Sequence, residues 1–188
     1  MIVIGYQGVG KSTLAAKNLR CIDLESNSFR GKDGIRPPDW YETYCSMAEE
    51  LSRQGYIVFT ASHEVVRNRL KDSTEEVIVC YPAAELKDAW IRRLEKRFLQ
   101  THLNKDYVAL ANAEARYEEN IREIEQSGFH ALVIDNPELS LEDLLPRVVE
   151  DLDSYYAEGM APPQFDYSKQ RARAEKETED SMGGISNE

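Results

Sequence analysis

The sequence predicts a three-layer α/β fold in which helices flank a five-stranded parallel sheet. Short apolar runs alternate along the chain with longer segments of helical periodicity, a pattern typical of parallel strands joined by helical crossovers. Residues 57–59 and 77–79 are continuously apolar, as expected of strands that are buried on both faces. A chain of 188 residues is also long enough to bury a sizeable core within one domain.

The individual elements follow from this alternation. Residues 39–54 carry apolar side chains at helical spacing and stop before Gly55, a residue that commonly terminates helices. Two charged helical segments, residues 83–100 and 106–127, form a long insertion before the last strand, at about residues 83–127. The five strands are predicted at residues 2–6, 20–24, 56–61, 77–81 and 131–135.

Composition indicates an intracellular, cytoplasmic protein. No apolar stretch approaches the roughly 20 residues that cross a bilayer, and we find no signal-peptide pattern at the start of the sequence. The three cysteines are odd in number and widely spaced, which favours reduced structural thiols over disulfides or metal ligands. A net charge of -11 argues against general nucleic-acid binding, because phosphate backbones attract clustered Lys and Arg.

The chain divides into one domain and a tail. Residues 1–157 carry all the predicted strands and helices, whereas residues 158–188 are polar, acidic and charged with little to bury. We expect this tail to be disordered, because it lacks the apolar surface that would offset the entropy of ordering.

The first apolar run leads directly into residues 5–12, which fit the phosphate-binding pattern G-x-x-x-x-G-K-S/T. Glycines allow the backbone to turn its N–H groups around an anionic phosphate, Lys11 adds a positive charge, and Ser12 offers a hydroxyl ligand to Mg²⁺. A glycine-rich turn without a ligand is the alternative. The pattern predicts the fold of P-loop nucleoside triphosphatases (NTPases), with ATP and Mg²⁺ as cofactors. The predicted nucleotide-binding residues are Gly8, Val9, Gly10, Lys11, Ser12 and Thr13.

Arg93 and Arg97 lie four residues apart on one predicted helix after the fourth strand. Side chains at this spacing are neighbours, so two guanidinium groups can converge on one anion such as a phosphoryl group in transfer. The alternative is a solvated helix in which both arginines pair with nearby acids of the same insertion.

Asp23 and Glu25 flank one residue at the end of the second predicted strand. Alternation places their carboxylates on the same face, at the edge of the sheet where ligands gather in open α/β folds. One of them could accept a proton, bind acceptor hydroxyls or hold Mg²⁺ through water. Two turn or helix-capping acids are the alternative.

Taken together, these motifs resemble the nucleoside monophosphate kinases and small-molecule kinases among P-loop proteins, and most narrowly phage and bacterial deoxynucleoside monophosphate kinase-like proteins. The matching pieces are residues 5–12, 21–25, 57–70 and the R-L-x-x-R sequence of residues 93–97. They span most of residues 1–140. Of these, the glycine pattern is highly specific, R-L-x-x-R is moderately so, and the others are weak individually.

The resemblance implies a mobile helical lid that excludes water from the nucleotide, with Arg93 and Arg97 contacting ATP and the transferring phosphoryl. Lys105 would close with the lid or remain an ordinary surface lysine. Many such kinases also carry an acid at the end of the strand beside the glycine loop, where this chain has Thr60 and Ser62. That departure leaves the outer ligands of the metal in doubt.

For the acceptor, the resemblance places a phosphate-binding arginine at Arg67, with an exposed helical arginine as the alternative. Trp40 and Tyr41 follow a segment rich in Gly, Pro and charge, and offer aromatic surfaces for a nucleobase or anchors for their own helix. The predicted substrate residues are Glu25, Trp40, Tyr41 and Arg67.

The resulting hypothesis is a phosphotransferase with Lys11, Arg93, Arg97 and Asp23 as its catalytic residues. Its acceptor is expected to be a (deoxy)nucleoside monophosphate, and the protein could work as a homodimer. Two rivals stay open. One is a kinase for a sugar acid, a nucleoside or a modified base, and the other is a nucleotide-binding switch that phosphorylates nothing.

Overall fold

The computed structural model describes residues 1–149, so the predicted tail, residues 158–188, lies outside the described residues. The α/β class and the five parallel strands with flanking helices are confirmed. Each strand lies within one or two residues of its predicted position. The strands are β1 (Ile2–Gly5), β2 (Cys21–Asp23), β3 (Ile57–Ala61), β4 (Val77–Pro82) and β5 (His130–Ile134).

The strand order in the sheet is β2-β3-β1-β4-β5, so β1 is central. Gly5 pairs with Ala61 of β3 and with Cys80 of β4, and the loops that follow β1 and β3 therefore begin at the same edge. All four residues of β1 are buried because neighbouring strands and helices on both faces cover them.

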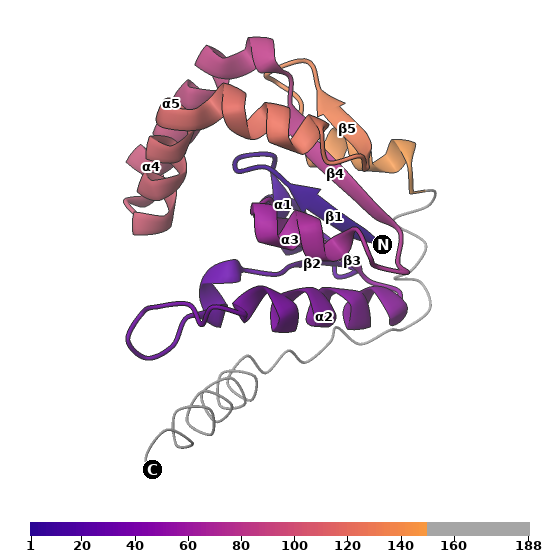
Figure 1. The fold of residues 1–188 in the computed structure, drawn as a ribbon. Helices are drawn as coiled ribbons and strands as arrows, with labels where there is room; N and C mark the ends of the chain where they lie inside the picture. Colours follow the sequence, from indigo (N-terminus) through magenta and orange to yellow (C-terminus); the bar gives the residue numbers. More distant parts are fainter. Residues whose placement is uncertain (150–188) are drawn as a thin grey trace.

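The helices form two layers, one on each face of the sheet (Figure 1). The connection from β1 to β2 runs across the sheet in the direction opposite to the later ones, and right-handed crossovers therefore place α1 on the face opposite α2 and α3. α6 packs beside α1, and α2 packs beside α3. The helices are α1 (Lys11–Lys17), α2 (Trp40–Arg53), α3 (Glu64–Leu70), α4 (Lys87–Thr101), α5 (Asn104–Glu125) and α6 (Leu141–Leu144).

The loops after β1 and β3 thus lead to helices on opposite faces. In open α/β sheets, the carboxyl edge between two such strands opens into the crevice where ligands bind. The fold places residues 5–12 in that position.

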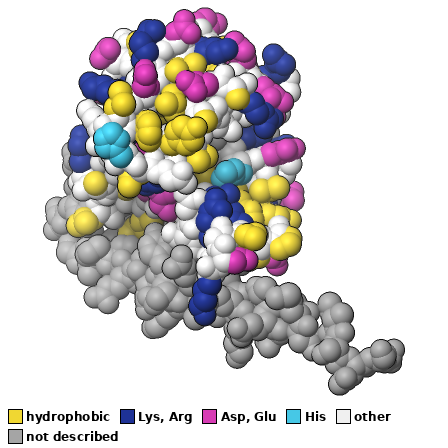
Figure 2. Space-filling view, turned by 90° about the vertical axis from the view of Figure 1, so that its left-hand side faces the viewer, with side chains coloured by type: hydrophobic (Ala, Val, Ile, Leu, Met, Phe, Trp, Pro, Cys, Tyr) yellow, Lys and Arg dark blue, Asp and Glu magenta, His cyan; other side chains and the backbone are white. Residues whose placement is uncertain are grey.

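The predicted helical insertion is a hairpin of α4 and α5. A short 3₁₀ turn, Ala84–Leu86, precedes α4, so the first helix begins later than predicted. α5 begins two residues earlier than predicted and contains a kink at Arg116, whose φ is -139°. The free end of the hairpin exposes apolar side chains, and Figure 2 shows yellow side chains gathered over this part of the molecule. The exposed residues are Leu99, Leu103, Tyr107 and Val108.

The remaining predictions about composition concern cysteines and membranes. Cys21, Cys45 and Cys80 are buried and unbonded, and burial raises the pKa of each thiol to about 12. None of the helices within residues 1–149 combines the length and the apolar composition that crossing a bilayer requires.

Candidate functional site

The glycine loop, residues 5–12, connects the buried end of β1 to the first turn of α1. Gly8 has φ 87° and Gly10 has φ 102°, backbone conformations that L side chains rarely adopt. Gly10 is also the N-terminal capping residue of α1. Between the two glycines, Val9 is fully buried and fixes the loop to the core.

Three surrounding helices hold this loop in place. Trp90 of α4 donates its indole N–H to the Gln7 carbonyl at 2.8 Å, and the Gln7 side chain donates to the Ala109 carbonyl of α5 at 2.7 Å. On the other face, the Leu141 N–H at the start of α6 donates to the Val9 carbonyl at 2.8 Å. The loop conformation therefore depends on contacts that lie far from it in the sequence.

Gly8 is also a steric requirement. A Cβ atom built there would lie 3.0 Å from Leu94 Cδ2 and 3.0 Å from Trp90 Nε1, closer than ordinary van der Waals contact. α4 approaches the glycine loop so closely that any larger residue would have to displace one of these side chains.

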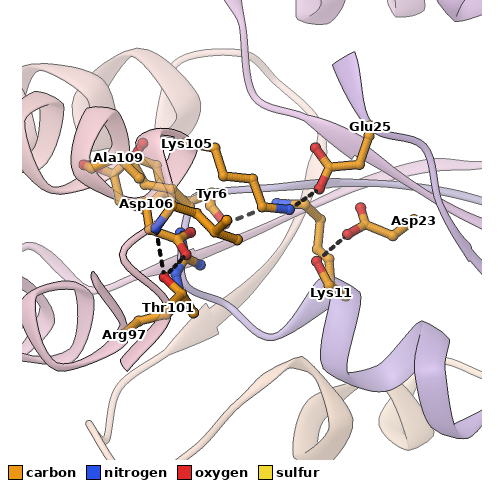
Figure 3. A network of polar contacts seen from close by, with 12 residues as sticks. Tyr6, Lys11, Asp23, Glu25, Arg97, Thr101, Lys105, Asp106 and Ala109 are labelled. Atoms are coloured by element: carbon orange, nitrogen blue, oxygen red, sulfur yellow. Dashed lines mark hydrogen bonds and ion pairs between the residues drawn. The ribbon is translucent and has the colours of Figure 1, made fainter. Parts of the chain in front are cut away.

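Lys11 lies at the centre of the site (Figure 3). Its ammonium group donates to the Gly5 carbonyl at 2.7 Å and to the Tyr6 carbonyl at 3.2 Å. Burial lowers the pKa of Lys11, and the negative charges of Asp23 and Glu25 oppose that shift. The ammonium group is thus positioned beside two carboxylates at the carboxyl edge of the sheet.

Ser12 and Asp23 lie together, and the Ser12 hydroxyl donates to the Asp23 carboxylate. A hydroxyl and a carboxylate are the oxygen ligands that Mg²⁺ prefers, held directly or through water. Ser12 and Thr13 are exposed at the start of α1 and accessible to a ligand. Residues 1–149 contain no cluster of three or more His, Cys, Asp or Glu that could hold a metal alone, so phosphate oxygens and water would have to complete the coordination sphere.

Glu25 forms an ion pair with Lys105 of α5 at 2.8 Å. Figure 3 shows Lys105 extending from the helical hairpin toward the end of β2. The hydrogen bond with Glu25 is the largest factor that raises the pKa of Lys105. Lys105 therefore contacts the candidate site, although about half of its side chain remains exposed, at 45%.

Arg93 and Arg97 have different partners, so their guanidinium groups do not meet on one point. Arg93 donates to the Pro137 carbonyl at 2.7 Å and to the Leu139 carbonyl at 3.0 Å, and its guanidinium lies 4.4 Å from the Trp90 ring centroid. It thereby connects α4 to the loop between β5 and α6. Among the described residues, Arg93 therefore neither shares a point with Arg97 nor pairs with an acid of the insertion.

Arg97 pairs with Asp106 of α5, whose Oδ1 lies 2.7 Å from Arg97 Nη2. Its Nε is buried and has no hydrogen-bond partner among the described residues. The positive charge of Arg97 makes a small contribution to the lowered pKa of Lys11, after burial and the nearby negative charges. Of the two arginines, Arg93 contacts the glycine loop directly, because its Nη1 donates to the Gly8 carbonyl at 3.5 Å.

A second group of polar side chains surrounds Trp40 at the start of α2. Arg36 lies over the Trp40 ring at 4.5 Å from the centroid and donates to the Ser26 hydroxyl at 2.9 Å. His63 contacts the Trp40 ring edge-on at 5.4 Å. Desolvation, and then the positive charges of Arg36 and Lys11, lower the pKa of His63 to about 4. Trp40 and Tyr41 are both partly buried and pack against the core, as the anchoring alternative expected.

Arg36 was missing from the predicted site residues. The signal that could have found it is its position within the Gly- and Pro-containing segment before Trp40, since a guanidinium commonly stacks on an indole.

The alternative prediction for Arg67, an exposed helical arginine, is wrong, because only 5% of its surface is exposed. Its guanidinium donates to the Ser62 carbonyl and forms an ion pair with Glu123 of α5 at 2.9 Å. These contacts join α3 to α5. Both of these partners of Arg67 belong to the fold.

Comparison with known proteins identifies no family for this chain. No model of a known protein family matches the sequence, and no curated protein is found to match it. The chemistry of the site must therefore be argued from its own residues.

Proposed function

We propose that this protein is a P-loop phosphotransferase that moves the γ-phosphoryl group of ATP, with Mg²⁺, onto a small acceptor, preferentially a (deoxy)nucleoside monophosphate. The observation that carries the proposal is that Lys11 and Asp23 both contact the glycine loop at the carboxyl edge of the central strand, while Arg97 is near enough to act on the pKa of Lys11. Phosphoryl transfer needs positioning and positive charge far more than covalent chemistry, and these residue types supply both.

Each residue would have a defined task. The N–H groups of the glycine loop and Lys11 would hold the β and γ phosphates, and Ser12 with Asp23 would hold Mg²⁺, which supplies charge neutralisation when bound. Arg97 would stabilise the charge that develops on the transferring group, because 40% of its side chain is exposed and its Nε has no hydrogen-bond partner among the described residues.

Arg93 would act differently from the sequence prediction. It donates to the Gly8 carbonyl of the glycine loop at 3.5 Å and to backbone carbonyls between β5 and α6, and we assign it the task of holding α4 against the glycine loop. Its contribution to catalysis would then be indirect, through the position of Arg97 one turn further along the helix.

The group around Trp40 supports an anionic, planar acceptor. Arg36 and Arg30 both donate to the Asn27 side chain, so two positive charges lie on this segment beside the aromatic ring. Asp23 and Glu25, whose charges act on Lys11, would orient the acceptor.

The test is to incubate the purified protein with radiolabelled ATP, Mg²⁺ and a mixture of the common nucleoside monophosphates, and to identify the labelled product. We expect transfer to one or a few of them and its loss in Lys11→Ala. Lys17→Ala is the matched control, because Lys17 lies on the same helix, is 57% exposed and pairs with the surface acid Glu142.

Two outcomes would contradict the proposal. If calorimetry with Mg²⁺ detects binding of neither ATP nor GTP, the assignment of the glycine loop is wrong. If nucleotide binds but no acceptor from nucleotide, sugar-acid or nucleoside panels is labelled, the protein is a nucleotide-binding switch instead.

A further inference from the structure

Asp106 is the most buried carboxylate in the described part of the helical hairpin, with 3% of its surface exposed. Its two oxygens have different partners. Oδ1 accepts from Arg97 Nη2 at 2.7 Å, and Oδ2 accepts from the Thr101 hydroxyl at 2.6 Å. Since a buried charge is costly unless paired and hydrogen-bonded, this carboxylate holds both partners in fixed positions.

The turn between α4 and α5 is built around the same carboxylate. Thr101 is the last residue of α4, and its hydroxyl also accepts the Leu103 N–H at 3.3 Å. His102 has φ 52°, which reverses the chain so that Asp106 falls in the first turn of α5. Arg97 and Thr101 are one turn apart on α4, and therefore present their side chains to Asp106 from the same face.

Arg97 would not be expected to remain near Lys11 without such a partner. The two side chains carry like charges, and 40% of the Arg97 side chain is exposed, so it could turn into solvent. Asp106 pairs with Arg97 through Nη2, and Arg97 Nε is buried without a partner among the described residues. The guanidinium is thus held through one nitrogen, in the network of Arg97, Thr101 and Asp106 that Figure 3 shows.

We propose that Asp106 is a positioning residue that fixes Arg97 toward the glycine loop before the nucleotide binds, an inference that rests on the proposed phosphoryl transfer. Asp106 itself touches neither phosphate nor acceptor. Its effect is that the ordering of Arg97 is completed when the protein folds, so the donor needs no reorganisation during the reaction. Thr101 orients the second oxygen of the carboxylate and contributes to the same effect.

The experiment compares Asp106→Asn with Asp88→Asn, which neutralises an exposed acid at the other end of α4. Asparagine keeps the size of the side chain and removes its charge. One fixed donor to a developing charge is worth roughly 100-fold to 1,000-fold in kcat, so a loosened donor is expected to lower kcat about tenfold. The affinity for ATP, measured by calorimetry, should change by less than about threefold, because the interaction matters most in the transition state. Asp88→Asn should behave as the unaltered protein does.

Dependence on Arg97 is tested with a double-mutant cycle. In an Arg97→Ala background, Asp106→Asn is expected to cause no further loss of kcat, since its only route to the reaction has been removed. A multiplicative further loss, or a loss of ATP affinity that equals the loss of kcat, would overturn the inference. If Asp106→Asn does not fold, Thr101→Val serves instead, because it removes one hydrogen bond to the carboxylate and keeps the ion pair; a smaller fall in kcat is expected, and an unchanged kcat would overturn the inference.

A second measurement does not depend on activity. The ¹⁵N NMR signal of Arg97 Nε–H should be resolved and slow to exchange with water in the unaltered protein, and should join the averaged signals of exposed arginines in Asp106→Asn. The two proposals fail in different ways. Absence of nucleotide binding or turnover in the unaltered protein overturns the proposed function, and the catalytic part of this inference with it. Normal turnover with an unchanged kcat in Asp106→Asn overturns this inference alone.

Discussion

Replacement of Gly8 by alanine tests whether the helical hairpin determines the shape of the glycine loop. Gly8 has φ 87°, and a new Cβ atom would meet Leu94 Cδ2 and Trp90 Nε1 at 3.0 Å each. Both side chains belong to α4 and both are fully buried. Neither can move away without disturbing the core, so backbone strain and overpacking should add.

The magnitude follows from these two effects. A left-handed conformation costs an L residue about 1–2 kcal/mol, and alanine recovers about 0.4–1 kcal/mol through the lower entropy of the unfolded chain. Overpacking a filled core adds about 1–3 kcal/mol. The expected loss is therefore roughly 2–4 kcal/mol, which corresponds to a fall in melting temperature on the order of 5–15 °C for a domain of this size.

Gly34→Ala is the matched control, because Gly34 has φ 77° and no heavy atom lies within 4 Å of a Cβ built there. It carries the backbone strain without the steric contact and should lose no more than about 1 kcal/mol. Differential scanning calorimetry of both variants gives the comparison. Equal destabilisation would show that α4 does not press on the loop, and a Gly8→Ala, Leu94→Ala pair with strictly additive losses would refute the steric contact directly.

Two further predictions concern Arg67 and His63, each of which lies near charged side chains. Arg67→Met should destabilise the protein by about 2–3 kcal/mol, because it leaves the Ser62 carbonyl without the Arg67 donor and Glu123 with only its longer ion pair to Arg116 at 3.5 Å among the described residues. Chemical denaturation measures this loss, and a stable variant with impaired acceptor binding would instead favour a substrate role. His63 should titrate in NMR well below its ordinary pKa of 6.5, and Arg36→Gln should raise that pKa by removing a positive charge. Since the folded pKa is the lower one, the unfolded chain takes up the proton first. The stability that neutral His63 contributes is complete above pH 6.5 and falls as the pH falls toward 4. An unchanged midpoint of the His63 titration in Arg36→Gln would contradict the role of Arg36.

The sheet was predictable because its signal is local. Buried parallel strands require continuous apolar runs, and the strands predicted at residues 2–6 and 77–81 differ from β1 and β4 by a single residue at one end. The capping box at the start of α6 is equally local, because Ser140 and Asp143 form both of its reciprocal bonds only three residues apart. Such elements depend on neighbours within a few residues, which the sequence displays directly.

The partners of the arginines were not predictable in the same way. Spacing along α4 placed Arg93 and Arg97 side by side, but their partners lie on other elements, at the Pro137 carbonyl and at Asp106. The same holds for Arg67. It is buried and pairs with Glu123 of α5, a contact that the periodicity of α3 does not indicate. Helical periodicity tells which residues share a face, and the tertiary contacts decide what that face meets.

The site and the helical hairpin are therefore linked by direct hydrogen bonds and an ion pair. Gln7, in the glycine loop, is bound by Trp90 of α4 and binds Ala109 of α5, so neither helix can move far without disturbing the backbone that would hold phosphates. Lys105 links the same hairpin to Glu25 at the end of β2. A ligand that competes for Glu25 or Arg97 would alter the contacts of the hairpin, and the hairpin would transmit that change to the loop through Gln7. Binding at the acceptor side and binding at the glycine loop should for this reason be coupled, through hydrogen bonds whose donors and acceptors can each be removed by a single substitution.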